Sequence, residues 1–123
     1  MLIEAVVRDD LEKVKQLLDD GSDVNIKDRA GDSPLHHAAA GGYDKIAELL
    51  IEHGADLNAR NYEQSTPLHF AASWRNEDVI EILLRHGADI NARTDHGLTP
   101  LQLAKSEDNK HVVKMLLELG AEE

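Results

Sequence analysis

A four-residue motif recurs along this chain at a constant spacing of 33 residues. It reads Ser33-Pro34-Leu35-His36, then Thr66-Pro67-Leu68-His69, then Thr99-Pro100-Leu101-Gln102. A glycine recurs at the same spacing, without insertion, at Gly21, Gly54, Gly87 and Gly120. Self-similarity at such a period is typical of repeat proteins, in which each unit buries its apolar face only against its neighbours.

Each repeat predicts two helices. The hydroxyl residues Ser33, Thr66 and Thr99 suit the N-cap of a first helix, and the proline that follows each of them suits its first position. A second helix follows, as in the apolar pattern of residues 78–84. Its predicted N-caps are Asp10, Asn76 and Asn109, and the recurring glycine is expected to end it in the left-handed region.

These motifs resemble those of the ankyrin repeat family, whose repeat has this length and carries Thr-Pro-Leu-His. The resemblance covers nearly the whole chain. It implies an all-α solenoid in which helix pairs stack in register and β-hairpin turns project to one side. It also implies a concave surface, made of hairpin tips and first helices, that binds other proteins.

The spacing divides the chain into four units within a single domain, residues 1–123. Unit 1 is an N-terminal capping unit (1–27), units 2 and 3 are full repeats (28–60 and 61–93), and unit 4 is a C-terminal capping repeat (94–123). Lys13 and Lys105 stand at positions that are aliphatic in the other units. Charges at stacking positions predict that both ends face solvent and that the array is complete.

The charge balance excludes several classes of function. Thirteen Lys and Arg face 24 Asp and Glu, for a formal net charge of −11. An acidic chain repels phosphate, so neither nucleic acid nor an anionic membrane is an expected partner, whereas a protein with some basic surface is. No cysteine is present, which is compatible with a reducing compartment. We expect a cytoplasmic (intracellular) monomer.

The seven histidines do not form a metal-binding or catalytic motif. No HExxH and no pair of histidines on one helical face occurs, and no Gly-x-Ser-x-Gly is present. In the resemblance, the histidine equivalent to His36 and His69 hydrogen-bonds within and between hairpins. The sequence therefore predicts no enzyme, no cofactor and no metal site.

Several departures from the repeat pattern carry predictions of their own. Gln64, Arg75 and Asp108 replace glycines, and each costs about 1–2 kcal/mol if its φ stays positive. Asn25, Asn58 and Asn91 are interpreted as tying each hairpin to the preceding helix end. Whether Asn25 or Asn58 is hydroxylated, as in some family members, stays open. Lys27, Arg60 and Arg93 form a basic row, interpreted either as a solvated charge ladder or as a strip for an acidic peptide.

The resemblance maps a partner-binding surface onto hairpin tips and the last residues of first helices. These candidates are Arg29, Ala30, Asp32, His37, Tyr62, Glu63, Ser65, Phe70, Ser73, Trp74, Asp95, His96, Leu98, Ser106 and Glu107. Trp74 is the only tryptophan, and Tyr62 belongs to the same unit. Tyr and Trp are frequent anchors of protein interfaces. The alternative is that Trp74 folds down over its loop and that Tyr62 is merely exposed.

The sequence thus favours a non-catalytic module that binds a partner protein through this surface. A second hypothesis is an engineered or consensus-like ankyrin scaffold with no evolved partner. The regular spacing favours it, whereas Gln64, Arg75 and Asp108 count against it, because a consensus sequence has glycine at these positions.

Overall fold

The computed structural model describes all residues, 1–123, and contains eight α-helices and no strand. The helices are α1 (Leu2–Val7), α2 (Leu11–Asp19), α3 (Pro34–Gly41), α4 (Asp44–Glu52), α5 (Pro67–Ser73), α6 (Glu77–Arg85), α7 (Pro100–Ser106) and α8 (Lys110–Glu118). None of them has the length and apolarity that crossing a membrane requires.

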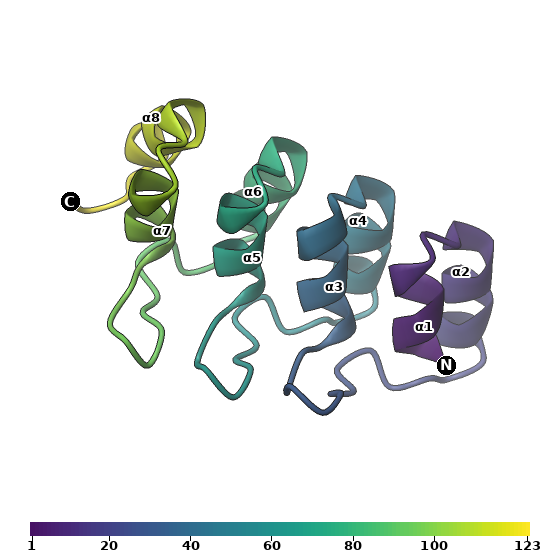
Figure 1. The fold of residues 1–123 in the computed structure, drawn as a ribbon. Coiled ribbons are helices and arrows are strands. Elements are labelled where there is room, and N and C mark those ends of the chain that lie inside the picture. The colour runs from purple at the N-terminus through teal and green to yellow at the C-terminus, as the bar shows by residue number, and fades with distance from the viewer.

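The helices form four pairs that stack one beside the next (Figure 1). The first helices α1, α3, α5 and α7 form one row, each in contact with the next, and the second helices α2, α4 and α6 form a row behind it. The long loops all project to the same side, and the two termini lie at opposite ends of the stack. The predicted all-α solenoid of four units is confirmed.

The projecting loops are turns and not the β-hairpins that we expected. Each closes with a backbone hydrogen bond over four residues, as from the Asn61 N–H to the Ser65 carbonyl oxygen (3.0 Å), but no ladder of strand pairing follows. Side chains bond the remaining loop amides. The Asn61 Oδ1, for example, accepts hydrogen bonds from the backbone N–H groups of Glu63 and Ser65.

The first helices begin where the sequence predicts. Ser33, Thr66 and Thr99 are their N-caps, and each hydroxyl accepts a hydrogen bond from the backbone N–H three residues later. The side chain of that later residue bonds back to the N-cap N–H, which completes a capping box. The proline at the first position has no N–H to leave unpaired.

Glycine ends each second helix, as predicted, with φ between 90° and 106° at Gly21, Gly54, Gly87 and Gly120. The three predicted departures also hold the left-handed conformation: φ is 63° at Gln64, 60° at Arg75 and 54° at Asp108. Asp9 (φ 56°), the unit 1 equivalent of Gly42, is a fourth case. Each non-glycine there costs about 1–2 kcal/mol.

The N-caps of the second helices correct part of our prediction. Asp10 accepts from the Lys13 N–H as expected (3.1 Å). Asn76 occupies the N-cap position, but its side chain donates to the Ala39 and Ala40 carbonyl oxygens of the preceding unit. Asn109 makes no cap bond either, and its buried Nδ2 has no partner. At Asn76, hydrogen bonds to the preceding unit thus replace the bond that would cap its own helix.

A single aliphatic core runs through the stack from Leu2 to Leu116. Its fully buried side chains are mostly leucine, isoleucine, valine and alanine, which fit between thin layers of helices. Lys13 and Lys105 are exposed at the two ends of the stack, and the capping role of the two end units stays a prediction.

Candidate protein-binding surface

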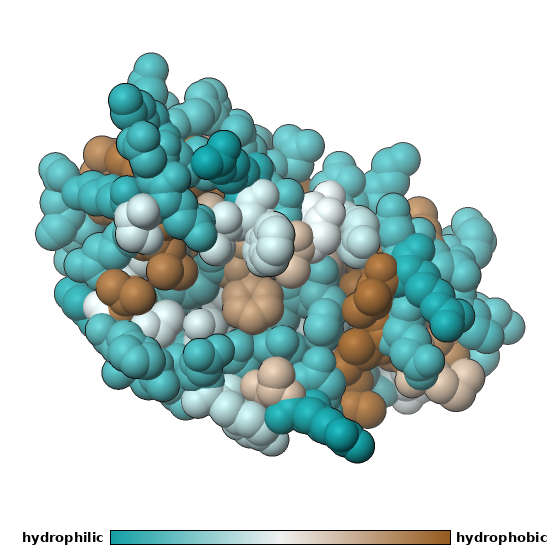
Figure 2. Space-filling view, viewed as in Figure 1, coloured by the Kyte–Doolittle hydropathy of each residue, from teal (hydrophilic) through white to brown (hydrophobic).

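The first helices and the loop tips form one continuous face of the molecule, which we call the first-helix face. It is the face turned toward the viewer in Figures 1 and 2. Hydrophobic side chains gather on it over α1 and in smaller patches toward α7, and polar side chains surround them (Figure 2).

Backbone hydrogen bonds hold the loop tips of this face in a fixed row. The Tyr62 N–H donates to the Ala30 carbonyl oxygen (3.1 Å), and the Asp95 N–H donates to the Glu63 carbonyl oxygen (3.0 Å). Each tip is therefore fixed to the tip of the next unit. Side chains at the tips are presented with little freedom of the backbone beneath them.

The basic row is part of this framework, a structural role that neither sequence interpretation included. The Lys27 Nζ donates to the Arg60 carbonyl oxygen (2.7 Å), and Arg60 in turn donates to the Arg93 carbonyl oxygen (2.8 Å). Arg93 donates to the Gly97 carbonyl oxygen within its own loop (3.0 Å). These cations thus bond backbone carbonyls, although Lys27 and Arg93 remain exposed to solvent.

The asparagines link units in the direction opposite to our interpretation. The Asn25 side chain donates to the Gly54 carbonyl oxygen and accepts from the Asp56 N–H (2.8 Å), both at the end of the second helix of the following unit. Asn58 accepts from the Asp89 N–H in the same way. These side chains thus tie each loop forward and not back to the preceding helix end.

His36 and His69 join neighbouring units from the inside. The His36 Nδ1 accepts from the Ser33 N–H (3.0 Å), and its Nε2 donates to the Ser65 carbonyl oxygen of the next unit (2.8 Å). His69 makes the same bonds to Thr66 and Leu98. Burial lowers the pKa of both imidazoles below its ordinary value, although the bonds to these carbonyls oppose the shift. Both histidines are thereby neutral structural links.

Trp74 and Tyr62 are the large aromatic side chains that this face leaves exposed. Trp74 is the C-cap of α5 and is 66% exposed, so it does not fold down over its loop. Tyr62, at a loop tip, is 72% exposed, and its ring lies against Gly31 of the preceding unit. A Cβ on Gly31 would come within 2.9 Å of the Tyr62 backbone nitrogen.

Two further candidates contact side chains of neighbouring units. Phe70 is half-buried in α5, and its ring meets the His36 ring edge-on with centroids 5.1 Å apart. The Ser73 hydroxyl, one residue before Trp74, donates to the Glu107 carboxylate of the next unit (3.1 Å).

The other candidate residues differ in how accessible the structure leaves them. Arg29, Ala30, Glu63, Asp95, His96, Leu98, Ser106 and Glu107 are exposed, and His37, Ser65 and Ser73 are half-buried. Asp32 is only 9% exposed and accepts a hydrogen bond from the Asn61 Nδ2 (2.9 Å). Its side chain supports the next loop and is not offered to a partner.

Two apolar residues of the first unit extend the exposed hydrophobic surface and were not predicted. Val7, at the end of α1, is 51% exposed, and Ile26, in the following loop, is 46% exposed. Val7 occupies the position of Ala40, Ser73 and Ser106 at the ends of the other first helices. The repeat spacing could have identified Val7 if the candidate surface had been extended to unit 1.

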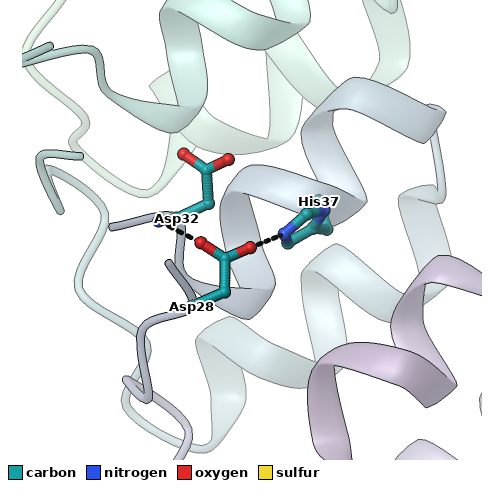
Figure 3. Close-up of side chains that lie close together, drawn as sticks. All are labelled: Asp28, Asp32 and His37. Atoms are coloured by element: carbon teal, nitrogen blue, oxygen red, sulfur yellow. Dashed lines mark hydrogen bonds and ion pairs between the residues drawn. The ribbon is translucent and has the colours of Figure 1, made fainter. Parts of the chain in front are cut away.

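One cluster could in principle hold a metal ion, since ligand atoms of Asp28, Asp32 and His37 lie within 4.8 Å of one another (Figure 3). Existing hydrogen bonds already use most of them. Asp28 accepts from His37 Nε2 (2.8 Å) and from the N–H groups of Ala30 and Asp32. The Asp32 carboxylate points away from this pair. Burial raises the pKa of Asp28, but these hydrogen bonds lower it overall. The cluster braces the loop.

Stacked helix pairs with linked loops and an exposed first-helix face are typical of repeat proteins that bind other proteins. Residues 2–94 match the family described as ankyrin repeats in three copies, and residues 96–122 match a further ankyrin repeat. The chain belongs to the ankyrin repeat family, whose repeats are protein-interaction modules.

Two relatives are similar to short segments of this chain, and about half of the aligned residues are identical. The nuclear factor NF-kappa-B p105 subunit of Gallus gallus is 52% identical over 46 residues, which is 37% of this chain and 5% of the relative. The protein phosphatase 1 regulatory subunit 27 of Homo sapiens is 47% identical over 49 residues, which is 40% of this chain and 32% of the relative. The similarity therefore spans less than a third of each relative.

Proposed function

We propose that this chain is a non-catalytic module that binds a partner protein on its first-helix face, with Tyr62 and Trp74 as anchors. The observation that supports this most is the exposure of both aromatics on one face of a single unit. Large aromatic side chains left in solvent cost free energy unless a partner covers them, and Trp and Tyr dominate interface energetics.

The rigid presentation of this face supports the same proposal. Its loop tips are linked by backbone hydrogen bonds, and its helices are capped and packed on a continuous core. A surface that is ordered before binding loses little conformational entropy on association. By its name, the protein phosphatase 1 regulatory subunit 27 acts on another protein, which is consistent with a binding role here.

The second hypothesis, a consensus-like scaffold without an evolved partner, keeps the support of its regular spacing. Arg75, Gln64 and Asp108 speak against it, because each holds a strained left-handed backbone where a designer would place glycine. The intracellular location and the monomeric state stay predictions.

The proposal is tested by partner retention on immobilised protein. The wild type is compared with Trp74→Ala and Tyr62→Ala, and with Glu81→Ala on the exposed side of α6 as a control. We expect each aromatic variant to weaken binding of a recovered partner about tenfold or more, as truncated anchors do, and the control to bind as the wild type. Equal affinity for all four proteins would contradict the proposal, provided that circular dichroism shows all four folded.

A further inference from the structure

An exposed carboxylate, that of Glu107, is bonded to the end of α5, where the indole of Trp74 is exposed. Trp74 and Glu107 are the C-caps of α5 and α7, which are neighbours in the stack. They are equivalent positions in successive units, 33 residues apart. The Ser73 hydroxyl, next to Trp74 in sequence, donates to both Glu107 carboxylate oxygens (3.1 and 3.3 Å). The carboxylate is thereby drawn toward the end of α5.

No positive charge of the chain neutralises this carboxylate. Two other carboxylates that reach between units are paired with basic side chains: Glu48 binds Arg85 and His86, and Glu77 binds His111. Glu107 forms no ion pair, and Arg75, the basic residue that follows Trp74, forms none either. The indole likewise forms no hydrogen bond to the protein.

Charged side chains of both signs adjoin this pair in the sequence. The exposed Asp108 follows Glu107 directly, and the exposed Arg75 follows Trp74. With a formal net charge of −11, the molecule attracts a basic partner at long range. The site thus combines one carboxylate without an ion pair and one exposed indole in a molecule of negative net charge.

We propose that the Trp74–Glu107 pair receives an arginine or lysine side chain of the partner protein. A cation over the face of tryptophan is attracted by the ring quadrupole, and a carboxylate beside it supplies a charge-assisted hydrogen bond. The Ser73 hydroxyl holds the carboxylate in place before binding. This inference rests on the proposed function and adds the chemical class of the residue that the partner inserts.

The test selects random twelve-residue peptides displayed on phage against the full chain and against Glu107→Gln. Glutamine keeps the size of the side chain and can still accept a hydrogen bond from Ser73, but it removes the charge. Glu118→Gln, an exposed glutamate of α8, is the matched control. We expect the wild type and the control to enrich a basic residue at one peptide position, and Glu107→Gln to lose that enrichment.

A selected peptide is then synthesised with arginine and with citrulline, its neutral isostere, at the enriched position. Citrulline should weaken binding to the wild type about fivefold or more and leave binding to Glu107→Gln nearly unchanged. Quenching of Trp74 fluorescence reports the site directly, because the chain has no other tryptophan. Equal affinities of both peptides for the wild type would overturn the inference.

The outcomes separate this inference from the proposed function. In one outcome, peptides lose binding with Trp74→Ala and yet show no preference for basic residues. That result would support the first-helix face as the binding site and would contradict the inference that the partner inserts a basic side chain. Failure to select any peptide whose binding depends on Trp74 would count against both.

Discussion

At the scale of single residues, His36 and His69 show how one side chain serves two units. Each ring accepts a hydrogen bond from the N-cap N–H at Nδ1 and donates one from Nε2 to a carbonyl of the next unit. Only the neutral tautomer with its hydrogen on Nε2 satisfies both bonds. If Nδ1 were protonated, its N–H would face the N–H of the N-cap residue, and that hydrogen bond would be lost. This agrees with the lowered pKa of both histidines.

This geometry predicts that acid destabilises the fold. The folded-state pKa of each histidine lies below its ordinary value of 6.5, so between these two values the unfolded chain binds more protons than the folded chain. The free energy of unfolding is therefore retained above about pH 6.5 and falls as the pH decreases below it, by at most about 1.4 kcal/mol per pH unit for each histidine. Urea melts at a series of pH values measure this slope.

The fourth unit supplies the control for this measurement. Gln102 stands in place of the histidine there, and its Oε1 accepts the Thr99 N–H at 2.9 Å. The double variant His36→Gln, His69→Gln should keep this cap bond and flatten the pH dependence between pH 6.5 and 5. An unchanged slope would show that other groups cause it.

At the scale of elements, the junction between units 3 and 4 differs from the one before it. The Asn76 side chain reaches the end of α3 because Gly42 has no side chain, and a Cβ there would lie 2.7 Å from the Asn76 Oδ1. Arg75 stands at the equivalent position in unit 3 and does carry a Cβ. Asn109 is then left buried with an unpartnered Nδ2.

Matched substitutions test this account of the two junctions. Asn76→Ala should cost about 1–3 kcal/mol, because it leaves buried carbonyl groups without their donor. Asn109→Ala should change stability by less than about 0.5 kcal/mol, since no hydrogen bond is lost. Arg75→Gly should stabilise by about 1 kcal/mol by relieving the left-handed backbone. In that background Asn109→Ala should become costly. Denaturant melts of the double-mutant cycle decide whether the two sites are coupled.

Helix ends could be read from sequence because their determinants are local. Ser33 and Gly54, for example, act within one turn of their own helix. The partners of the bonds between units could not be predicted from sequence. Whether a side chain such as Asn76 or Lys27 bonds a near or a distant carbonyl depends on how the units stack. The burial of Asp32 follows from Asn61 of the next unit in the same way.

At the scale of the whole molecule, each layer of helices touches only its neighbours. Units 2 and 3 are covered on both sides, whereas units 1 and 4 are covered on one. Stability in such a stack is the sum of unit and junction terms. The exposure of Trp74 and Tyr62 could be predicted at this scale, because the register identifies the positions that stacking leaves free. The position of the Glu107 carboxylate at the end of α5 could not be predicted, because it depends on the hydrogen bond from Ser73.

Cavities should therefore act differently in the middle and at the end of the stack. Leu83 and Leu116 are both fully buried, in units 3 and 4. Leu83→Ala should cost about 2–5 kcal/mol in global unfolding. Leu116→Ala should mainly accelerate hydrogen exchange in α7 and α8 and leave α4 protected. Hydrogen-exchange mass spectrometry distinguishes the two patterns, and uniform acceleration in both variants would indicate a single cooperative globule.

The bonds between units also constrain how this protein can change in evolution. His36 and His69 each reach a carbonyl 29 residues ahead, and Asn25 and Asn58 each reach an amide 31 residues ahead. A codon inserted between any such pair would displace a donor from its acceptor. Lineages should therefore gain or lose length by duplicating or deleting entire repeats, with smaller insertions confined to the two ends.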